Sequence, residues 1–106
     1  MRKLFYACLV AMLFATPATA ACYSGIGCTD EDWFEEDDLD YLKCGALWEL
    51  RNVIYHERGY CFKTKRAINY FGNDECEYDD AEDIEFSDVE WNNITVISDV
   101  EDYKGC

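Results

Sequence analysis

The chain has 106 residues and a formal net charge of −14 at pH 7, because 23 Asp and Glu residues outnumber 9 Lys and Arg residues. Nucleic acids and anionic membrane surfaces repel so acidic a protein, so we expect neither as a partner. The 7 cysteines in so short a chain indicate instead an exported protein held together by disulfides.

Residues 1–20 have the three parts of a secretory signal peptide. Two basic residues are followed by an apolar run over residues 4–15 and by Ala-Thr-Ala at residues 18–20, which matches a cleavage site. The apolar run is too short to span a bilayer and no later segment approaches its length, so we expect no transmembrane segment. The mature chain then begins at Ala21 and is secreted or periplasmic. A lipidated Cys22 is the alternative, although a threonine stands where a lipobox has a leucine-like residue.

The mature chain keeps six cysteines, and its formal charge falls to −16 because two basic residues leave with the signal peptide. An even number of cysteines in a small exported domain is typical of a disulfide framework, which compensates for a small hydrophobic core. Zinc binding by cysteine and His56 is the competing use, but the sequence contains no C-x-x-C pair. We therefore expect disulfides, no metal and no cofactor.

Residues 21–43 form an acidic lead-in, which we separate from a helical domain at residues 44–106. Turn-forming residues between Cys22 and Cys28 allow these two cysteines to close a small loop. Repulsion among the carboxylates that follow favours a loop or a single frayed turn. The apolar residues expected to anchor this segment are Trp33, Phe34, Leu39 and Leu42.

The first helix is predicted over residues 45–58. An apolar stripe recurs there at helical spacing and consists of Leu47, Trp48, Leu50, Ile54 and Tyr55. Gly59 stands where a helix ends in a left-handed residue, and Tyr60 after it can pack on Tyr55. The sequence therefore predicts a helix with a defined C-terminal end.

A second, shorter helix is predicted over residues 65–71, with Thr64 as its N-cap and a glycine after its end. Its inward residues are expected to be Ala67, Ile68 and Phe71. Because the link between the two helices is short, we expect them to pack as a hairpin. Residues 74–85 are acidic and lack periodicity, so a loop is predicted there.

The third helix has a strong start signal. Ser87 and Glu90 form a capping box, and Phe86 can pack on Trp91 as a hydrophobic staple. Gly105 ends the helix. Its apolar face is predicted to hold Val89, Val96, Val100 and Tyr103, with Ile94 and Ile97 beside it. The branched residues of that face also suit a strand, and the caps at both ends decide for a helix.

Together these elements predict an all-α fold, a small three-helix, disulfide-stapled domain with acidic loops. Six cysteines allow fifteen pairings. A first helix of about 14 residues is roughly 20 Å long, which places Cys44 and Cys61 at its opposite ends. A second helix antiparallel to the first would bring Cys76 to Cys44 and leave Cys106 near Cys61. The predicted disulfides are therefore Cys22–Cys28, Cys44–Cys76 and Cys61–Cys106.

Residues 51–62 read Arg-Asn-Val-Ile-Tyr-His-Glu-Arg-Gly-Tyr-Cys-Phe, and this run resembles the YARHG domain, a small helical module of exported bacterial proteins. The family's Tyr-Ala-Arg-His-Gly corresponds to Tyr-His-Glu-Arg-Gly at residues 55–59, so the chain departs from the family at the central Ala-Arg-His. The resemblance covers about residues 42–76. It is closest to a cysteine-bearing subgroup with Gly-Tyr-Cys-Phe-Lys-Thr and a terminal Glu-x-x-x-Gly-Cys. It implies a module of the cell envelope that has no catalytic activity.

Five basic residues lie between two acidic segments in the middle of the chain: Arg51, Arg58, Lys63, Lys65 and Arg66. With the free N–H groups at the start of the second helix, they predict a site for a phosphate, a sugar acid or a carboxylate. We assign a peptidoglycan-like ligand to Arg51, Arg58, Lys63 and Arg66. In the alternative interpretation, acidic residues 31–38 or 74–83 fold over these cations and neutralise them.

Three other candidate sites have less support. His56 and Cys61 make a poor nucleophilic pair, because no third group orients them and Cys61 is expected in a disulfide. The acidic residues 74–83 offer oxygen ligands for calcium but match no EF-hand spacing. Trp33 and Phe34 are the aromatic residues expected to be free to stack on a sugar.

The sequence therefore predicts a non-enzymatic binding or interaction module of the cell envelope, with a cell-wall polymer as its partner. The alternative is a small acidic inhibitor or effector that presents its carboxylates to a basic protein partner. An enzyme is the third class, and it lacks a triad, a metal motif or a paired acid and base in this sequence.

Overall fold

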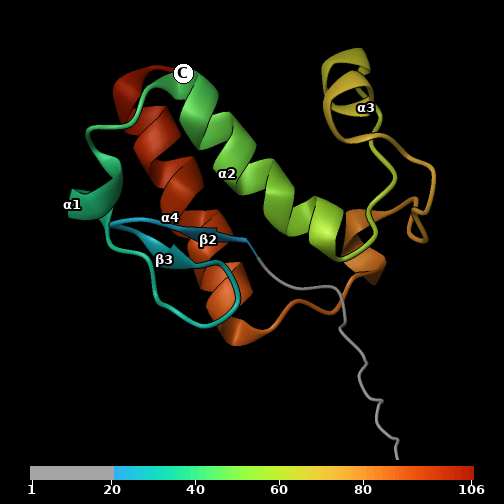
Figure 1. Cartoon of the computed structure of the whole chain (residues 1–106), viewed down its shortest axis with the longest axis horizontal. Helices are drawn as coiled ribbons and strands as arrows, with labels where there is room; N and C mark the ends of the chain where they lie inside the picture. The colour runs from blue at the N-terminus through green and yellow to red at the C-terminus, as the bar shows by residue number, and fades with distance from the viewer. Residues whose placement is uncertain (1–20) are drawn as a thin grey trace, which may run out of the picture.

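The computed structural model describes residues 21–106, so the predicted signal peptide at residues 1–20 lies outside the described part of the chain. Two long helices, α2 (Cys44–Glu57) and α4 (Asp88–Lys104), lie side by side, and α3 (Lys65–Phe71) lies on the far side of α2 from α4 (Figure 1). The smaller elements are α1 (Glu36–Leu39), the 3₁₀ turn η2 (Ala81–Asp83) and an antiparallel hairpin of β2 (Cys22–Tyr23) and β3 (Gly27–Cys28). The predicted fold of three main helices is confirmed, and the hairpin adds to it. Within residues 21–106, no helix has the length and apolar character needed to cross a membrane.

The apolar stripe of α2 forms one side of the core. Its buried members are Leu47, Leu50 and Ile54, and its partly buried members are Trp48 and Tyr55. The helix ends as predicted: Gly59 has a φ of 87°, its amide donates to the carbonyl of His56 at 3.0 Å, and the amide of Tyr60 donates to the carbonyl of Tyr55 at 3.1 Å. These two bonds are those of a Schellman ending.

The start of α4 confirms the predicted capping box and staple. Ser87 Oγ accepts a hydrogen bond from the amide of Glu90 at 3.1 Å, and the Glu90 carboxylate accepts one from the amide of Ser87 at 2.9 Å. The rings of Phe86 and Trp91 stack with their centroids 6.0 Å apart. The predicted apolar face is partly wrong, since Tyr103 is 83 % exposed. The buried residues of α4 are Glu90, Asn93, Ile94, Ile97 and Val100, and two of these are polar residues that an apolar pattern does not reveal.

Two of the three predicted disulfides are wrong. The bonds are Cys22–Cys28, as predicted, Cys44–Cys106 and Cys61–Cys76, in place of Cys44–Cys76 and Cys61–Cys106. The prediction assumed that α3 returns along α2, but α3 has only 7 residues. The helix that runs antiparallel to α2 is α4, whose 17 residues span about 25 Å. The end of α4 therefore reaches the start of α2, and Cys76 stays near Cys61.

The second predicted helix begins as expected, since Thr64 Oγ1 accepts a hydrogen bond from the amide of Ala67 at 3.2 Å. Ala67 is buried and Phe71 is partly buried, but Ile68, which was predicted to point inward, is exposed. Contact with α2 is made by rings, with the centroids of Phe71 and Trp48 5.9 Å apart. The main partner of α2 is α4, so the predicted hairpin of α2 and α3 is not the body of the domain.

The segment that precedes α2 belongs to the same core as the helices. Phe34 and Leu39 are buried in one cluster with apolar residues of α2 and α4. Asn93 of α4 holds this segment: its side-chain oxygen accepts from the amide of Phe34 at 2.8 Å, and its nitrogen donates to the carbonyls of Thr29 at 3.0 Å and Asp32 at 2.8 Å. The boundary that we placed at residue 44 therefore does not separate two cores.

Candidate functional site

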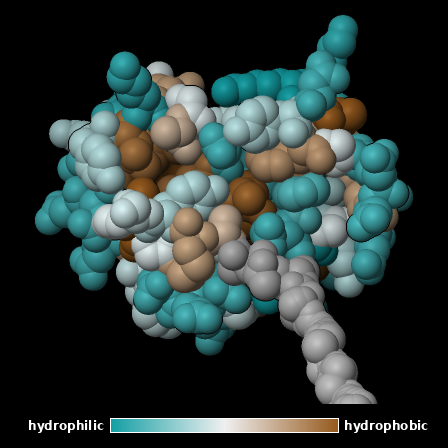
Figure 2. Space-filling model, in the orientation of Figure 1, coloured by the Kyte–Doolittle hydropathy of each residue, from teal (hydrophilic) through white to brown (hydrophobic). Residues whose placement is uncertain are grey.

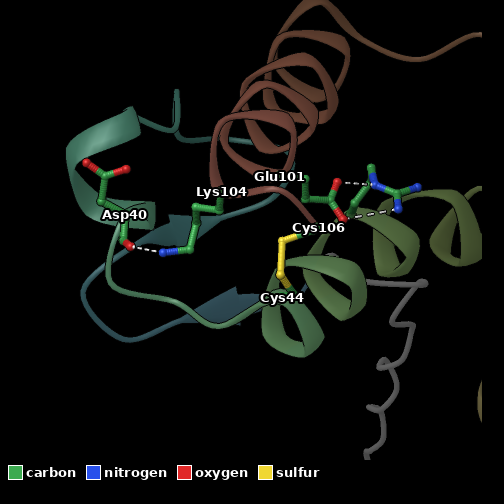
Figure 3. The surroundings of a disulfide bond; sticks show 6 residues. Asp40, Cys44, Glu101, Lys104 and Cys106 are labelled. Carbon is green, nitrogen blue, oxygen red and sulfur yellow. Dashed lines mark hydrogen bonds and ion pairs between the residues drawn. A yellow bond between two sulfur atoms is a disulfide. The ribbon is translucent and has the colours of Figure 1, made fainter.

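Arg51, the first residue of the predicted anion site, is engaged inside the molecule. Its Nε and Nη2 atoms donate to the two carboxylate oxygens of Glu101 on α4, at 2.6 and 3.2 Å. Glu101 lies beside the Cys44–Cys106 disulfide that joins the ends of α2 and α4 (Figure 3). Both side chains of the pair are largely buried. A carboxylate of the chain thus occupies the place that an anionic ligand would take.

Arg58, the C-cap residue of α2, is neutralised in the same way. Its Nε donates to both carboxylate oxygens of Glu90, at 3.0 and 2.9 Å, and its Nη2 donates to one of them at 2.6 Å. Glu90 is only 3 % exposed. Burial by itself raises the pKa of Glu90, but hydrogen bonds from Arg58 and Ser87 outweigh burial and hold that pKa below its usual value. Glu90 is therefore charged at neutral pH, and Arg58 is its counter-ion.

The remaining basic residues are exposed. Lys63 Nζ lies 3.6 Å from the Asp79 carboxylate and 5.6 Å from the centroid of the Tyr60 ring. The guanidinium carbon of Arg66 lies 3.8 Å from the centroid of the Trp48 ring, within the range of a cation–π contact. These contacts place both side chains around the start of α3.

The five basic residues therefore do not form one site. Two of them pair with carboxylates of α4, and Lys63, Lys65 and Arg66 form a separate exposed group. The alternative interpretation, neutralisation by an acidic segment, holds only for Asp79 and Lys63. The main counter-ions, Glu90 and Glu101, come from α4, which the sequence reasoning did not consider for this role.

A groove of about 770 Å³ opens where α2 ends. Its walls are the last turn of α2 with the residues after it (56–60), the end of α3 (71–72) and the acidic loop (74–78). Three aromatic residues line it, namely Tyr60, Phe71 and Tyr78. This groove is formed by residues that the sequence places in three separate segments.

Backbone hydrogen bonds and a disulfide fix the acidic loop against the turn that follows α2. The carbonyl of Gly59 accepts hydrogen bonds from the amides of Glu77 at 2.7 Å and Tyr78 at 3.0 Å, and the amide of Cys61 donates to the carbonyl of Tyr78 at 2.8 Å. The Cys61–Cys76 disulfide closes the same loop. The walls of the groove are therefore held in place before any ligand arrives.

Asn73 supports the groove from outside its walls. Its Oδ1 accepts from the amide of Phe62 at 2.9 Å and its Nδ2 donates to the carbonyl of the same residue at 3.0 Å. From the sequence, Asn73 was expected to help end the second helix and was one of the candidate calcium ligands; its role as a backbone clamp was missed, as was that of Asn93. An amide side chain that follows a helix-ending glycine is the one local signal that could have indicated a backbone clamp.

Most of the charged residues that line the groove are acidic. Its carboxylates are Glu57, Asp74, Glu75 and Glu77, while the guanidinium of Arg58 on the same wall is bonded to Glu90. Partial burial is the main cause that raises the pKa of Glu57; the charge of His56 opposes it, and the carboxylates of Asp30 and Glu90 raise the pKa further to a smaller extent. Such a groove attracts cations and repels anions.

The nucleophilic pair that we considered does not form. Cys61 is bonded to Cys76, and the ring of His56 packs on the ring of Phe71 with the centroids 5.1 Å apart. Within residues 21–106, no group of three or more His, Cys, Asp or Glu side chains has an arrangement suited to a metal ion. These contacts give His56 and Cys61 structural roles.

The aromatic pair predicted for sugar stacking is half correct. Trp33 is more than half exposed, but Phe34 is buried in the core. Trp91, which was expected to be used for packing, stacks on Phe86 and still remains more than half exposed. A flat sugar ring would therefore find single exposed tryptophans at these positions.

Comparison with protein families gives one match: the model of the YARHG domain matches residues 15–102. No curated protein and no solved structure matches the chain. The matched range contains the hairpin, α1, α2, α3 and most of α4, so it extends well beyond residues 42–76, where the sequence resemblance was recognised.

Proposed function

Because the chain belongs to the YARHG domain family, we propose that it is an exported, non-catalytic interaction module of the cell envelope that binds a cationic partner protein. The observation that carries this proposal is the allocation of charges: the two arginines nearest the core are bonded to carboxylates of α4, whereas the groove at the end of α2 keeps four carboxylates on its walls.

Export is supported by the covalent structure. Three disulfides are typical of an oxidising compartment, outside the cell or in the periplasm. Residues 1–20, which carry the sequence pattern of a signal peptide, would direct the chain there.

A non-catalytic role is supported by the use that the fold makes of its reactive side chains. Cys61 is oxidised in a disulfide and therefore has no thiolate to act as a nucleophile. His56, the single histidine of the chain, packs against Phe71. Cys61 and His56, the two side chains considered for nucleophilic catalysis, thus stabilise the structure of the domain.

A cationic partner is supported by the charge of the surface. The formal charge of the chain without residues 1–20 is −16, and hydrophilic residues cover much of the rim of the face in Figure 2. Long-range attraction between such a surface and a basic protein increases the rate of association and falls with added salt. The proposed interaction is therefore expected to be salt-sensitive.

A second candidate is an anionic envelope polymer bound at the three exposed basic residues Lys63, Lys65 and Arg66. The observation that favours it is the stacking of Arg66 on Trp48, which presents a cation and an aromatic surface together, as recognition of a sugar acid would require. This candidate retains two of the four residues, Lys63 and Arg66, that the sequence assigned to a peptidoglycan-like ligand.

Binding of the disulfide-bonded protein to polylysine-coated beads and to purified sacculi separates the candidates. Each is measured at about 20 and about 300 mM salt, between which the Debye length falls about fourfold. We expect retention on polylysine that is lost at high salt, and no retention on sacculi. The variant Lys65→Glu/Arg66→Glu should bind polylysine at least as well as the wild type. Binding to sacculi that this variant abolishes would contradict the proposal and favour the polymer.

A further inference from the structure

We propose that the groove at the end of α2 is the recognition site for a lysine or arginine side chain of the partner. This inference rests on the proposed function and gives it a location and a chemical specificity. The groove has a volume of about 770 Å³, which lies in the range of ligand sites and accommodates a long side chain with part of its backbone.

Glu57 is the first reason for this assignment. It is the last residue of α2, where the partial negative charge of a helix end opposes a carboxylate. The side chain is also partly buried and lies near other carboxylates, which raises the pKa of Glu57. Within residues 21–106, its carboxylate has no hydrogen bond or ion pair to a basic residue that would offset these costs.

A carboxylate kept in an unfavourable place is a signature of a functional site, and the attraction of a bound cation would offset these costs. The cation on the same wall, Arg58, cannot serve this purpose because its guanidinium makes three contacts with the buried carboxylate of Glu90. Glu57 therefore has no cationic hydrogen-bond partner within residues 21–106, and a cation of the partner would supply one.

The aromatic lining is the second reason. Tyr60, Phe71 and Tyr78 line the groove, and aromatic rings attract an ammonium or guanidinium group and cover the methylene groups that carry it. A cation of the chain already uses one of these rings: Lys63 Nζ lies 5.6 Å from the centroid of Tyr60. Lys63 is exposed, so a partner's cation can displace it from this ring.

The fixed backbone is the third reason. The loop that carries Glu77 and Tyr78 is bonded to Gly59 and closed by the Cys61–Cys76 disulfide. The walls need little ordering when a side chain enters the groove. Little of the binding free energy is therefore spent on organising the site.

The test is a titration of the isotope-labelled, disulfide-bonded protein with acetyl-Gly-Lys-Gly-amide, followed by the backbone amide signals. We expect saturable shifts concentrated at Gly59, Gly72 and Tyr78, and none with the peptide in which norleucine replaces lysine. Glu57→Gln should weaken binding about fivefold, because a charge-assisted contact of a partly buried carboxylate is lost. The matched control Glu36→Gln removes the same charge from exposed α1, outside the groove, and should change affinity by less than about 1.5-fold.

A second pair of variants tests the groove through its internal competitor. Lys63→Ala should strengthen binding of the peptide about twofold, because the ring of Tyr60 becomes free for the lysine of the peptide. An effect of this size is expected for an exposed cation–π contact. Lys65→Ala changes the net charge by the same amount on the same surface and should have a smaller effect. Equal effects of the two variants would show that only overall charge matters and would overturn the proposed site.

The failure of this inference is distinguishable from the failure of the proposed function. If the protein is retained on polylysine but Glu57→Gln and Glu36→Gln weaken peptide binding equally, the groove is not the site and the proposed function stands. If shifts do not saturate up to about 20 mM peptide, the groove has no useful affinity for the side chain and the inference is overturned. If polylysine is not retained at low salt either, both proposals fail.

Discussion

The interface between α2 and α4 and the groove at the end of α2 treat charge in opposite ways. In the interface, Arg51 and Arg58 each meet a carboxylate of α4 at 2.6 Å, and the buried Glu90 also caps the helix to which it belongs. In the groove, carboxylates line the walls and Glu57 has a raised pKa. The interface satisfies its charges internally and stabilises the fold, whereas the carboxylates of the groove have no ion pair within residues 21–106.

This difference explains why the basic residues of the sequence do not form the single anion site that was predicted. A cation in a sequence predicts an anion site only if no carboxylate of the same chain reaches it first. Here Glu101 and Glu90, from the distant helix α4, reach Arg51 and Arg58 first. The groove could not be recognised in the sequence, because three separate segments form its walls.

The largest expected effect on stability comes from removing either of two disulfides, Cys44–Cys106 or Cys61–Cys76. Removing Cys44–Cys106, which closes a loop of 62 residues across the interface, should lower the free energy of unfolding by about 4 kcal/mol. Removing Cys61–Cys76, which closes 15 residues beside the groove, should cost about 3 kcal/mol. Paired Cys→Ser variants compared by urea unfolding measure both. Peptide mapping without reduction must first find these two linkages, and any other pairing would contradict the structure.

The next effect concerns the Arg58–Glu90 ion pair, in which the carboxylate is buried. Arg58→Ala leaves the carboxylate of Glu90 buried without a counter-ion and should lower the free energy of unfolding by about 2–3 kcal/mol. The control Arg66→Ala removes an exposed stacking contact and should cost less than about 1 kcal/mol. Equal costs in thermal or urea unfolding would show that the interface does not depend on the Arg58–Glu90 pair.

A similar but smaller effect is expected where the acidic segment meets α4. Asn93→Ala leaves the amide of Phe34 and the carbonyls of Thr29 and Asp32 without their partner, which should cost about 2 kcal/mol. Asn92→Ala, one position along the same helix, removes only a 3.3 Å contact and should cost less than about 0.5 kcal/mol. Urea unfolding of both variants measures the difference, and a neutral Asn93→Ala would mean that the lead-in is not anchored here.

Local signals predicted the local structure well. Capping at Ser87 and Thr64 and the glycine after α2 gave the helix boundaries, because the groups that satisfy the ends of a helix are close in sequence. The YARHG resemblance at residues 51–62 was confirmed by the family match. These elements are specified by residues within a few positions of one another.

Long-range features could not be predicted in the same way. The Cys44–Cys106 bond and the Arg58–Glu90 pair depend on which helix lies against α2, and a short link to α3 suggested the wrong one. The buried Asn93 is a polar residue among apolar positions, and only the carbonyls that it meets explain it. The groove is harder still to predict from the sequence, because it forms only when the acidic loop lies against the ends of α2 and α3.

The smallest expected effect tests the groove without any ligand. Because the pKa of Glu57 is raised in the folded protein, its charge destabilises the fold above that pKa, and the penalty disappears as the pH falls toward the pKa of the unfolded chain. The lowered pKa of Glu90 acts in the opposite direction, with stability lost only as the pH falls through its folded value. Glu57→Gln should therefore raise the free energy of unfolding at pH 7 by about a few tenths of a kcal/mol, a value discounted because solvent screens the charge of a partly buried group. The gain should vanish near pH 4, where wild-type Glu57 is itself protonated. A gain that persists at pH 4, or a loss at pH 7, would show that Glu57 contributes to the fold as the interface residues do, and the contrast between the two regions would not hold.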